Sequence, residues 1–482
     1  MHDSVPPFAV LKGSAMALSP PHTRRTRDVD ATDDTHDPVD ERVGVARSVS
    51  LGFQHVLVMY AGVIAVPLIF AQTMGLTASQ TITLLNINLI VGGIGTLIQT
   101  LGLWKFGARF PLVQGASFIG LAPSLLIGQD YGLRYVFGSV IAAGLIVLVA
   151  APLLGQVLRL FPPVVIGSVI TIVGLSLMPA AAGWFGGGAD SPDFGSAENL
   201  ALGAGTVVLI VALYAFTRGA WRNLSILVAL VVGTVIALSA GMTDFGDVGS
   251  ASWAGISNPF ELGAPAFSPI PILVMTLAMF VIVAETTGNM LAIGRMASTE
   301  VTPQRLASAF RGDGLSTAIG GLFHGFPLNA FSQNSGLIAM TGVRSRFVVA
   351  TGGVLMILMG LVPKLGAVVA AIPPSVLGGA AIVMFGMTTA AGIQELARVR
   401  YEGTNNSLVV AVAVSVGVLP MAAPTLFEKF DGTLGMVLSS GILLGTVAAV
   451  VLNLVCNLRR TPAGRDAAST SHSATEDLEV VR

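Results

Sequence analysis

Long runs of apolar residues, separated by short polar connections, fill the chain between residues 51 and 456. Most of these runs approach the roughly 20 residues that a helix needs to cross the hydrocarbon of a bilayer. The pattern therefore predicts fourteen membrane-spanning segments, of which the third, ninth and tenth are short or are interrupted by glycine and polar residues. The predicted segments are 51–71, 83–103, 114–128, 135–156, 163–182, 199–216, 222–240, 268–294, 305–322, 328–341, 347–366, 374–393, 405–420 and 433–456.

The composition agrees with a membrane protein and excludes other classes. Hydrophobic residues make up 53% and charged residues 11% of the 482 residues, whereas a soluble domain carries about 25% charged residues. A chain with so few charges lacks the polar surface of a soluble enzyme and the basic face that a nucleic-acid partner requires. Its one cysteine, Cys456, excludes a disulfide scaffold.

The charges that are present concentrate in two polar tails. Residues 1–47 carry 14 charged side chains and residues 459–482 carry 8. Segments with many charges and few apolar residues cannot bury enough surface to fold, so both tails are predicted to be disordered. No apolar stretch that resembles a cleavable signal precedes residue 51.

The basic residues predict the orientation, because cytoplasmic loops of membrane proteins are enriched in Lys and Arg. When the spans alternate from a cytoplasmic N-terminus, the outer side receives Arg134, Lys364 and Lys429, and the long outer loops 183–198 and 241–267 contain no Lys or Arg. Both termini are therefore predicted to be cytoplasmic. The basic residues on the cytoplasmic side are then Lys105, Arg109, Arg159, Arg218, Arg222, Arg295, Arg305, Arg344, Arg346, Arg398, Arg400, Arg459 and Arg460.

Two short sequences recur at nearly the same offset. FPLVQGASF begins at Phe110 and FPLNAFSQN at Phe326, 216 residues later; PPVVIG begins at Pro162 and PPSVLG at Pro373, 211 residues later. The order and spacing indicate two homologous halves of seven segments each. Because seven is odd, the second half must be inverted in the membrane, as in many secondary transporters.

Few side chains in the apolar segments can ionise or make strong hydrogen bonds. The candidates are Glu285, Asp313, His55, Gln333 and Asn334. A charged side chain at the bilayer centre costs about 2.5–3.5 kcal/mol even on an insertion scale, so such residues by default face a cavity or a partner and have a function. Structural pairing of the acids with neighbouring helices, and simple packing of the histidine, remain alternatives.

The third and tenth segments are predicted to be broken helices. Pro327 restricts the residue before it to an extended conformation, and a half-helix is expected to start at Ser332 or Gln333, with a matching one near Ala116–Ser117. The free N–H groups and positive dipole ends of two half-helices would then meet inside the membrane. Phe118 and Phe331 flank this point, and aromatic faces beside amides and carboxylates suit a flat heterocycle with N–H and C=O edges.

Several motifs resemble those of a known family. The sequence QNSGLIAMTG at Gln333–Gly342 is similar to the signature of the nucleobase–ascorbate transporter family, in which a Thr follows the Gly by five residues; Thr341 holds that place. The pair Gln54–His55, ETTGN at 285–289 and GDG at 312–314 also stand where that family carries its motifs.

The resemblance extends over residues 50–456 and implies an all-α polytopic fold of fourteen segments in two inverted repeats. It also implies a homodimer in the bacterial inner membrane that takes up a nucleobase together with protons by an elevator-type movement. Segments 1–4 and 8–11 would form a core domain, and segments 5–7 and 12–14 a gate domain. The implied parts are tails at 1–47 and 459–482, core at 48–157 and 265–367, and gate at 158–264 and 368–458.

The resemblance also implies roles for single residues. Glu285 corresponds to the substrate-binding carboxylate, and Gln333 to a second substrate contact with Asn334 as its supporting neighbour. Asp313 resembles the carboxylate linked to proton coupling, and His55 resembles the first-helix histidine that organises the site. The other implied positions are Phe118, Phe331, Ser117 and Ser332 around the substrate, and Asn289 and Thr341 as supporting residues.

Three departures within the family bear on the substrate. Uracil-type members tend to carry Glu at the place of Gln333, so the amide favours a purine. Xanthine-type members often carry Asn at the place of Ser117 and Asp at that of Asn289, and the smaller Ser117 favours uric acid, followed by xanthine.

Other functions remain as alternatives. They are a uracil or other pyrimidine permease and, with less support, an anion exchanger of the same fold. A membrane enzyme finds no support, because the sequence offers no metal-ligating cluster, no phosphate-binding loop and no usable nucleophile–base pair. No metal is expected, and no cofactor other than the coupling proton.

Overall fold

The computed structural model describes residues 37–157, 161–189, 191–243, 245–255, 261–430 and 432–457. The predicted disorder of the tails falls mostly on residues 1–36 and 458–482, which lie outside this part. The first half of the described chain forms η1 (Pro38–Asp40), α1 (Val45–Thr73), α2 (Ala78–Leu101), β1 (Gln114–Ala116), α3 (Phe118–Tyr131), α4 (Leu133–Val157), α5 (Pro163–Ser176), α6 (Met178–Phe185), α7 (Ala197–Phe216), α8 (Ala220–Asn223), α9 (Ser225–Ser239) and α10 (Gly246–Ser250).

The second half begins with α11 and repeats the pattern of helices around one short strand. Its elements are α11 (Pro269–Ala297), α12 (Pro303–Leu322), β2 (Leu328–Ala330), α13 (Ser332–Thr341), α14 (Arg346–Gly360), α15 (Pro363–Ala370), α16 (Pro374–Leu396), α17 (Asn406–Ala422), η3 (Pro424–Phe427), α18 (Gly432–Ser439) and α19 (Gly441–Asn457).

Seven helices in the described part are long and apolar enough to cross a membrane. An eighth crossing results if α14 and α15, which meet at a bend of 80°, count as one broken span, and α9, α17 and α19 are shorter apolar helices. The chain is therefore a mostly helical, multi-pass membrane protein, as the sequence predicted. Each of the fourteen predicted segments overlaps at least one helix, but fourteen crossings remain a prediction.

Local sequence explains where many helices begin and how closely they pack. Proline occupies the first turn of α5, α11, α12 and α16, where its missing N–H costs nothing. Glycines let backbones touch: a Cβ at Gly93 of α2 would lie 2.5 Å from the carbonyl oxygen of Gly353 on α14, and one at Gly144 of α4 would lie 2.6 Å from the nitrogen of Ala318 on α12. Small residues at such crossings are the usual basis of helix association in membranes.

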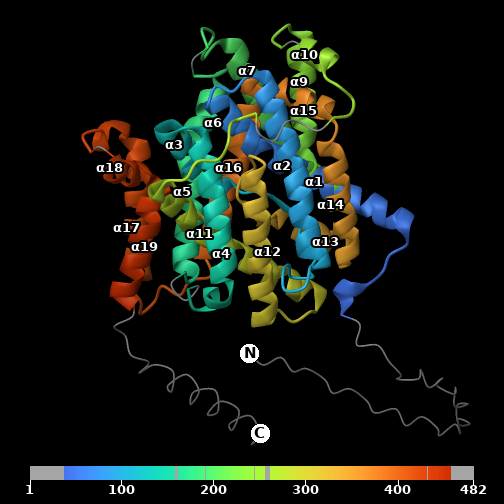
Figure 1. The fold of residues 1–482 in the computed structure, drawn as a ribbon. Coiled ribbons are helices and arrows are strands. Elements are labelled where there is room, and N and C mark those ends of the chain that lie inside the picture. Colours follow the sequence, from blue (N-terminus) through green and yellow to red (C-terminus); the bar gives the residue numbers. More distant parts are fainter. Residues whose placement is uncertain are drawn as a thin grey trace, which may run out of the picture. The chain divides into compact units, whose positions relative to one another are not determined.

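Most contacts between helices fall within two groups, whose members are labelled in Figure 1. In the first, α4 packs along α11 and α12, and α14 packs along α1 and α2. In the second, α16 packs against α5, α6 and α7, and α17 packs along α19. That these groups move as a core domain and a gate domain is still a prediction.

One short strand pair lies within the first group. β1 and β2 are antiparallel, with Gln114 opposite Ala330, Gly115 opposite Asn329 and Ala116 opposite Leu328. Both strands are buried, and α3 and α13 start directly after them. Extended stretches followed by half-helices therefore lie where the sequence predicted them.

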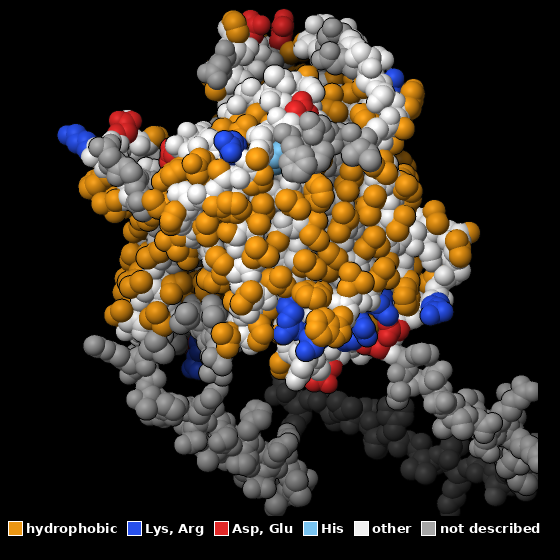
Figure 2. Space-filling model, viewed as in Figure 1, with side chains coloured by type: hydrophobic (Ala, Val, Ile, Leu, Met, Phe, Trp, Pro, Cys, Tyr) orange, Lys and Arg blue, Asp and Glu red, His pale blue; other side chains and the backbone are white. Residues whose placement is uncertain are grey.

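The outer surface agrees with a bilayer environment. Figure 2 shows apolar side chains covering the middle of the visible face. Lys and Arg side chains gather towards the lower end of this view, where α12 and α13 are labelled in Figure 1. Exposed large apolar residues of this surface include Leu145, Val149 and Leu153 of α4.

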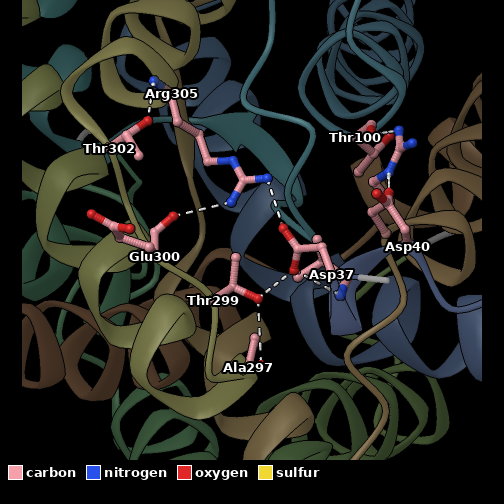
Figure 3. Close-up of polar contacts among 10 residues, drawn as sticks. Asp37, Asp40, Thr100, Ala297, Thr299, Glu300, Thr302 and Arg305 are labelled. Atoms are coloured by element: carbon pink, nitrogen blue, oxygen red, sulfur yellow. Dashed lines mark hydrogen bonds and ion pairs between the residues drawn. The ribbon is translucent and has the colours of Figure 1, made fainter. Parts of the chain in front are cut away.

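Residues 37–42, here named the N-terminal strap, belong to the fold although the sequence placed them in a disordered tail. Asp37 caps η1 and accepts hydrogen bonds from Thr299 Oγ1 (2.5 Å) and Arg305 Nη2 (2.9 Å) (Figure 3). Arg305 also donates to the carbonyl of Glu300 (3.1 Å), and Val39 is completely buried. The strap is thereby fixed to the α11–α12 connection.

A second ion pair attaches the other end of the strap to α14. Asp40 pairs with Arg346, whose Nη1 also donates to the carbonyls of Thr100 (2.8 Å) and Leu101 (3.0 Å) at the end of α2. The Ser345 hydroxyl donates to the carbonyl of Glu41. These partners explain the difference from the sequence prediction, because charges that look solvated in sequence are paired in the fold.

The Asp37 carboxylate predicts a pH-dependent contribution to stability. Burial alone would raise its pKa, but hydrogen bonds from Thr299, Arg305 and the Val39 N–H, with the charge of Arg305, hold the pKa below its usual value. Such stabilisation is present above the unfolded-state pKa of about 4 and is lost as the pH falls through the folded-state value. Asp37→Asn should therefore lower the unfolding free energy by about 1 kcal/mol at pH 7 and by much less at pH 3.5.

Thermal unfolding of the purified protein in detergent at the two pH values measures this difference. Glu300→Gln is the matched control, because Arg305 contacts the backbone carbonyl of Glu300 and not its side chain, and it should leave the melting temperature unchanged. An equal loss of unfolding free energy for Asp37→Asn at both pH values would contradict the stabilising role assigned to the Asp37 carboxylate.

Candidate functional site

The polar centre of the molecule is built around Glu285, near the middle of α11. Its Oε2 accepts a hydrogen bond of 2.7 Å from Nδ2 of Asn329 on β2. One helical turn further along α11, Asn289 donates to the carbonyl of Ala330 at 2.7 Å. Residues four apart lie on one helix face, so a single face of α11 contacts β2 through both side chains.

The second acid, Asp313 of α12, is fully buried. Its Oδ1 accepts hydrogen bonds from Gln99 Nε2 (2.7 Å) and Gln114 Nε2 (3.1 Å), and Thr286 also lies beside it. The oxygen of the Gln99 amide accepts from the N–H of Ala108 (2.9 Å). Two neutral amides, one on α2 and one on β1, therefore hold this carboxylate, although both are about 200 residues away from it in the sequence.

The strand pair separates the two acids. Successive side chains of a strand point to opposite faces, and Gln114 is paired with Ala330 whereas Asn329 is paired with Gly115. Gln114 and Asn329 therefore project from opposite faces of the pair, one towards Asp313 and the other towards Glu285. Thr286, the residue after Glu285 on α11, lies beside Asp313, so the two acids belong to one polar region.

The first turn of α13 is anchored near His55. Asn334 donates from Nδ2 to the carbonyl of Pro111 at 2.6 Å, and its side chain lies beside the buried imidazole of His55 on α1. The backbone of Ser332 and Gln333 forms the start of α13. The side chains of these two residues lie outside the described part of the structure, so their predicted substrate contacts stay predictions.

The remaining predicted residues are distributed around the two half-helices. The Ser117 hydroxyl caps α3 by accepting from the N–H of Ile119 (3.2 Å), and Phe118 meets Phe385 of α16 edge-on, with ring centroids 5.7 Å apart. Phe331 is 6% exposed, and its ring covers Gly115. Thr341 lies at the far end of α13, where it bonds the carbonyl of Leu337.

The structure thus brings Glu285, Asn289, Asp313 and the half-helix starts to one strand pair. Sequence reasoning missed three amides of the site, Asn329, Gln99 and Gln114. Each stands in an apolar run, where burying an unpaired amide would cost about 1–3 kcal/mol. The same cost argument that selected the acids would have found these residues. In the described part of the chain, no group of three or more His, Cys, Asp or Glu side chains could hold a metal ion.

Two acids held inside a multi-pass helical protein, beside the ends of broken helices, are typical of a membrane transporter. Residues 46–426 match a family profile described as "Permease family", and the chain belongs to this family. The family consists of transporters, so the prediction that the protein is not an enzyme is confirmed.

Curated relatives identify the branch. The chain is 40% identical to the xanthine permease of Bacillus subtilis over 417 residues, which cover 86% of this chain and 95% of the relative. It is 38% identical to the uric acid transporter UacT of Escherichia coli over 425 residues, 87% of this chain and 88% of the relative. The predicted membership of the purine permease branch of the nucleobase–ascorbate transporter family is confirmed.

Solved structures show the same fold at low sequence identity. The transmembrane domain of a cyanobacterial bicarbonate transporter, BicA, superposes with a TM-score of 0.56 at 18% identity, covering 86% of this chain and all of that domain. The anion transporter Slc26a9 of mouse gives a TM-score of 0.57 at 13% identity, covering 90% of this chain and 74% of the other.

The Asp313 network predicts a non-additive pair of substitutions. Gln99→Leu leaves a buried carboxylate with one amide donor fewer, so it should lower the unfolding free energy by about 2 kcal/mol. In an Asp313→Leu background the same change should cost clearly less, because no carboxylate loses a donor and only the bonds of Gln99 to the backbone of Ala108 and Ala309 are lost. Thermal unfolding of the wild type, both single variants and the double variant measures the coupling, and additive losses would show that the two side chains act independently.

Proposed function

We propose that the protein takes up a purine nucleobase, uric acid or xanthine, in symport with protons. The observation that carries the proposal is the Glu285–Asn329 contact at the strand pair, in a chain 38–40% identical to relatives named as xanthine and uric acid permeases. The carboxylate is a strong acceptor for the N–H groups of a purine dione, and the Gln333 amide offers one donor and one acceptor for an N–H/C=O edge.

The arrangement of the acids supports coupling to protons. Glu285 and Asp313 have neutral amides as their partners in the described part of the structure, so neither acid has its charge cancelled by a cation. Like charges in one polar region repel, so a proton bound by one acid would make it easier for the other to remain ionised. Binding of the base and of the proton would thus be linked through one polar network.

The two helix groups support an elevator-type movement. The strand pair and both acids belong to the first group, and Phe118 of α3 meets Phe385 of α16 across the boundary. The first group would act as the core that carries the substrate past the second group. The proposal includes a homodimer in the bacterial inner membrane with cytoplasmic termini.

The fold favours one competing function, anion exchange, because BicA is named as a bicarbonate transporter. The positive ends of two half-helices suit an anion. A carboxylate at the same place repels a small inorganic anion, so Glu285 favours the nucleobase. A uracil permease remains the alternative within the family.

Glu285→Gln should reduce the initial rate of xanthine and urate uptake at least tenfold, because a charged acceptor of buried hydrogen bonds is worth about 1.5–3 kcal/mol. Uptake of radiolabelled substrate by cells expressing equal amounts of membrane-inserted protein measures the effect. Glu300→Gln, which removes an exposed acid at the end of the molecule, is the matched control. Wild-type uptake by Glu285→Gln would refute the assigned role.

A protonophore should abolish accumulation of the substrate above its external concentration. Competition by unlabelled urate, xanthine, uracil and bicarbonate in the same assay identifies the substrate class. The proposal expects inhibition by urate or xanthine at the lowest concentrations and none by bicarbonate; inhibition by uracil alone would move the protein to the pyrimidine permeases.

A further inference from the structure

Asn329 occupies the centre of β2 and belongs to none of the predicted site positions. It lies opposite Gly115 in the strand pair, is 7% exposed and donates to Oε2 of Glu285 at 2.7 Å. Gly115 has no side chain, and the ring of Phe331 fills the space above it. The Asn329 amide is therefore enclosed on a buried strand and, among the described residues, has Glu285 as its hydrogen-bond partner.

The recurring sequences FPLVQGASF and FPLNAFSQN differ at the position of Asn329. With their offset of 216 residues, Asn329 corresponds to Val113 and Gln114 corresponds to Ala330. Each sequence thus contributes one amide to the strand pair, but at neighbouring positions that face opposite ways. Gln114 donates a hydrogen bond to the buried Asp313, and Asn329 donates one to Glu285. The two faces of an otherwise symmetric strand pair therefore differ chemically.

The contacts of α11 show why a donor at this place determines where the carboxylate points. Asn289 fixes the same helix face to the carbonyl of Ala330, so the distance between α11 and β2 is set independently of Asn329. With the helix fixed, the bond to Asn329 selects the rotamer of Glu285 and occupies Oε2. Within the described part of the structure, the other oxygen, Oε1, accepts no hydrogen bond, so it can accept one from a ligand.

We propose that Asn329 is a positioning residue that orients the Glu285 carboxylate for the N–H groups of the nucleobase. The inference rests on the proposed function and deepens it. An amide can do this because it donates without adding charge, whereas a carboxylate at the same place would compete for a proton, since like charges about 3 Å apart cannot both ionise.

Two variants separate positioning from mere structural support. Asn329→Leu removes the donor and should raise KM for xanthine or urate about tenfold, with a smaller change in the maximal rate. Asn329→Asp keeps the shape but creates a carboxylate pair, so its uptake should be weak at pH 8 and recover towards pH 5.5, where the pair shares a proton. The wild type should not show this added acid dependence. A purely structural defect would lower uptake at every pH alike.

Initial-rate uptake across pH 5.5–8 measures both effects. Asn405→Asp is the matched control, because this exposed residue between α16 and α17 undergoes the same chemical change far from the site. A wild-type KM for Asn329→Leu together with a wild-type pH profile for Asn329→Asp would overturn the positioning role.

A readout without substrate keeps this test separate from the proposed function. Infrared spectra of the purified protein, with Glu285→Gln to assign the band, report the protonation of Glu285. Asn329→Leu should increase the carboxylic acid C=O band at neutral pH, because the ionised form loses its donor. An unchanged band would refute the inference even if xanthine is transported. Failure of the wild type to transport any purine would refute the proposed function, and with it the part of the inference that names the ligand.

Discussion

Backbone groups inside a bilayer must find hydrogen-bond partners within the protein, and this constraint governs the site. A helix satisfies its own backbone, but a broken helix leaves N–H and C=O groups free. Here β1 and β2 pair, and two bonds prolong the pairing: from the Ser117 N–H to the carbonyl of Pro327 and from the Phe331 N–H to the carbonyl of Val113. The outward N–H groups of Gln114 and Leu328 donate to threonine hydroxyls of α2 and α12. This closed pair allows two half-helices to start in the interior, and their starts surround the acids.

The acids of the interior and those at the ends of the molecule are stabilised differently. Among the described residues, Asp37, Asp40 and Glu395 form ion pairs with arginines, whereas Glu285 and Asp313 receive hydrogen bonds from amides. An arginine would neutralise a buried carboxylate permanently. An amide lowers the cost of burial but leaves the net charge in place, so the group can still respond to a proton or a ligand.

Sequence patterns predicted the elements of the site better than its contacts. The apolar runs and Pro327 predicted the broken helices, and the cost of burying a charge identified Glu285 and Asp313. The cost argument would also have found the amides Asn329 and Gln114, but their partners depend on the register of two strands more than 200 residues apart, which no local pattern encodes. The strap was missed for a similar reason: Asp37 and Asp40 look solvated until Arg305 and Arg346 are placed beside them.

The strap also bears on the order of assembly. Asp37 precedes the first membrane helix, yet its partner Arg305 lies 268 residues further along the chain, and Arg346 follows Asp40 by 306. A ribosome releases the two aspartates early and both arginines late, so these ion pairs close only after α12 and α14 have been synthesised. The contacts of the strap therefore form after its own synthesis by about 300 residues, and they join an early part of the chain to helices that are completed much later.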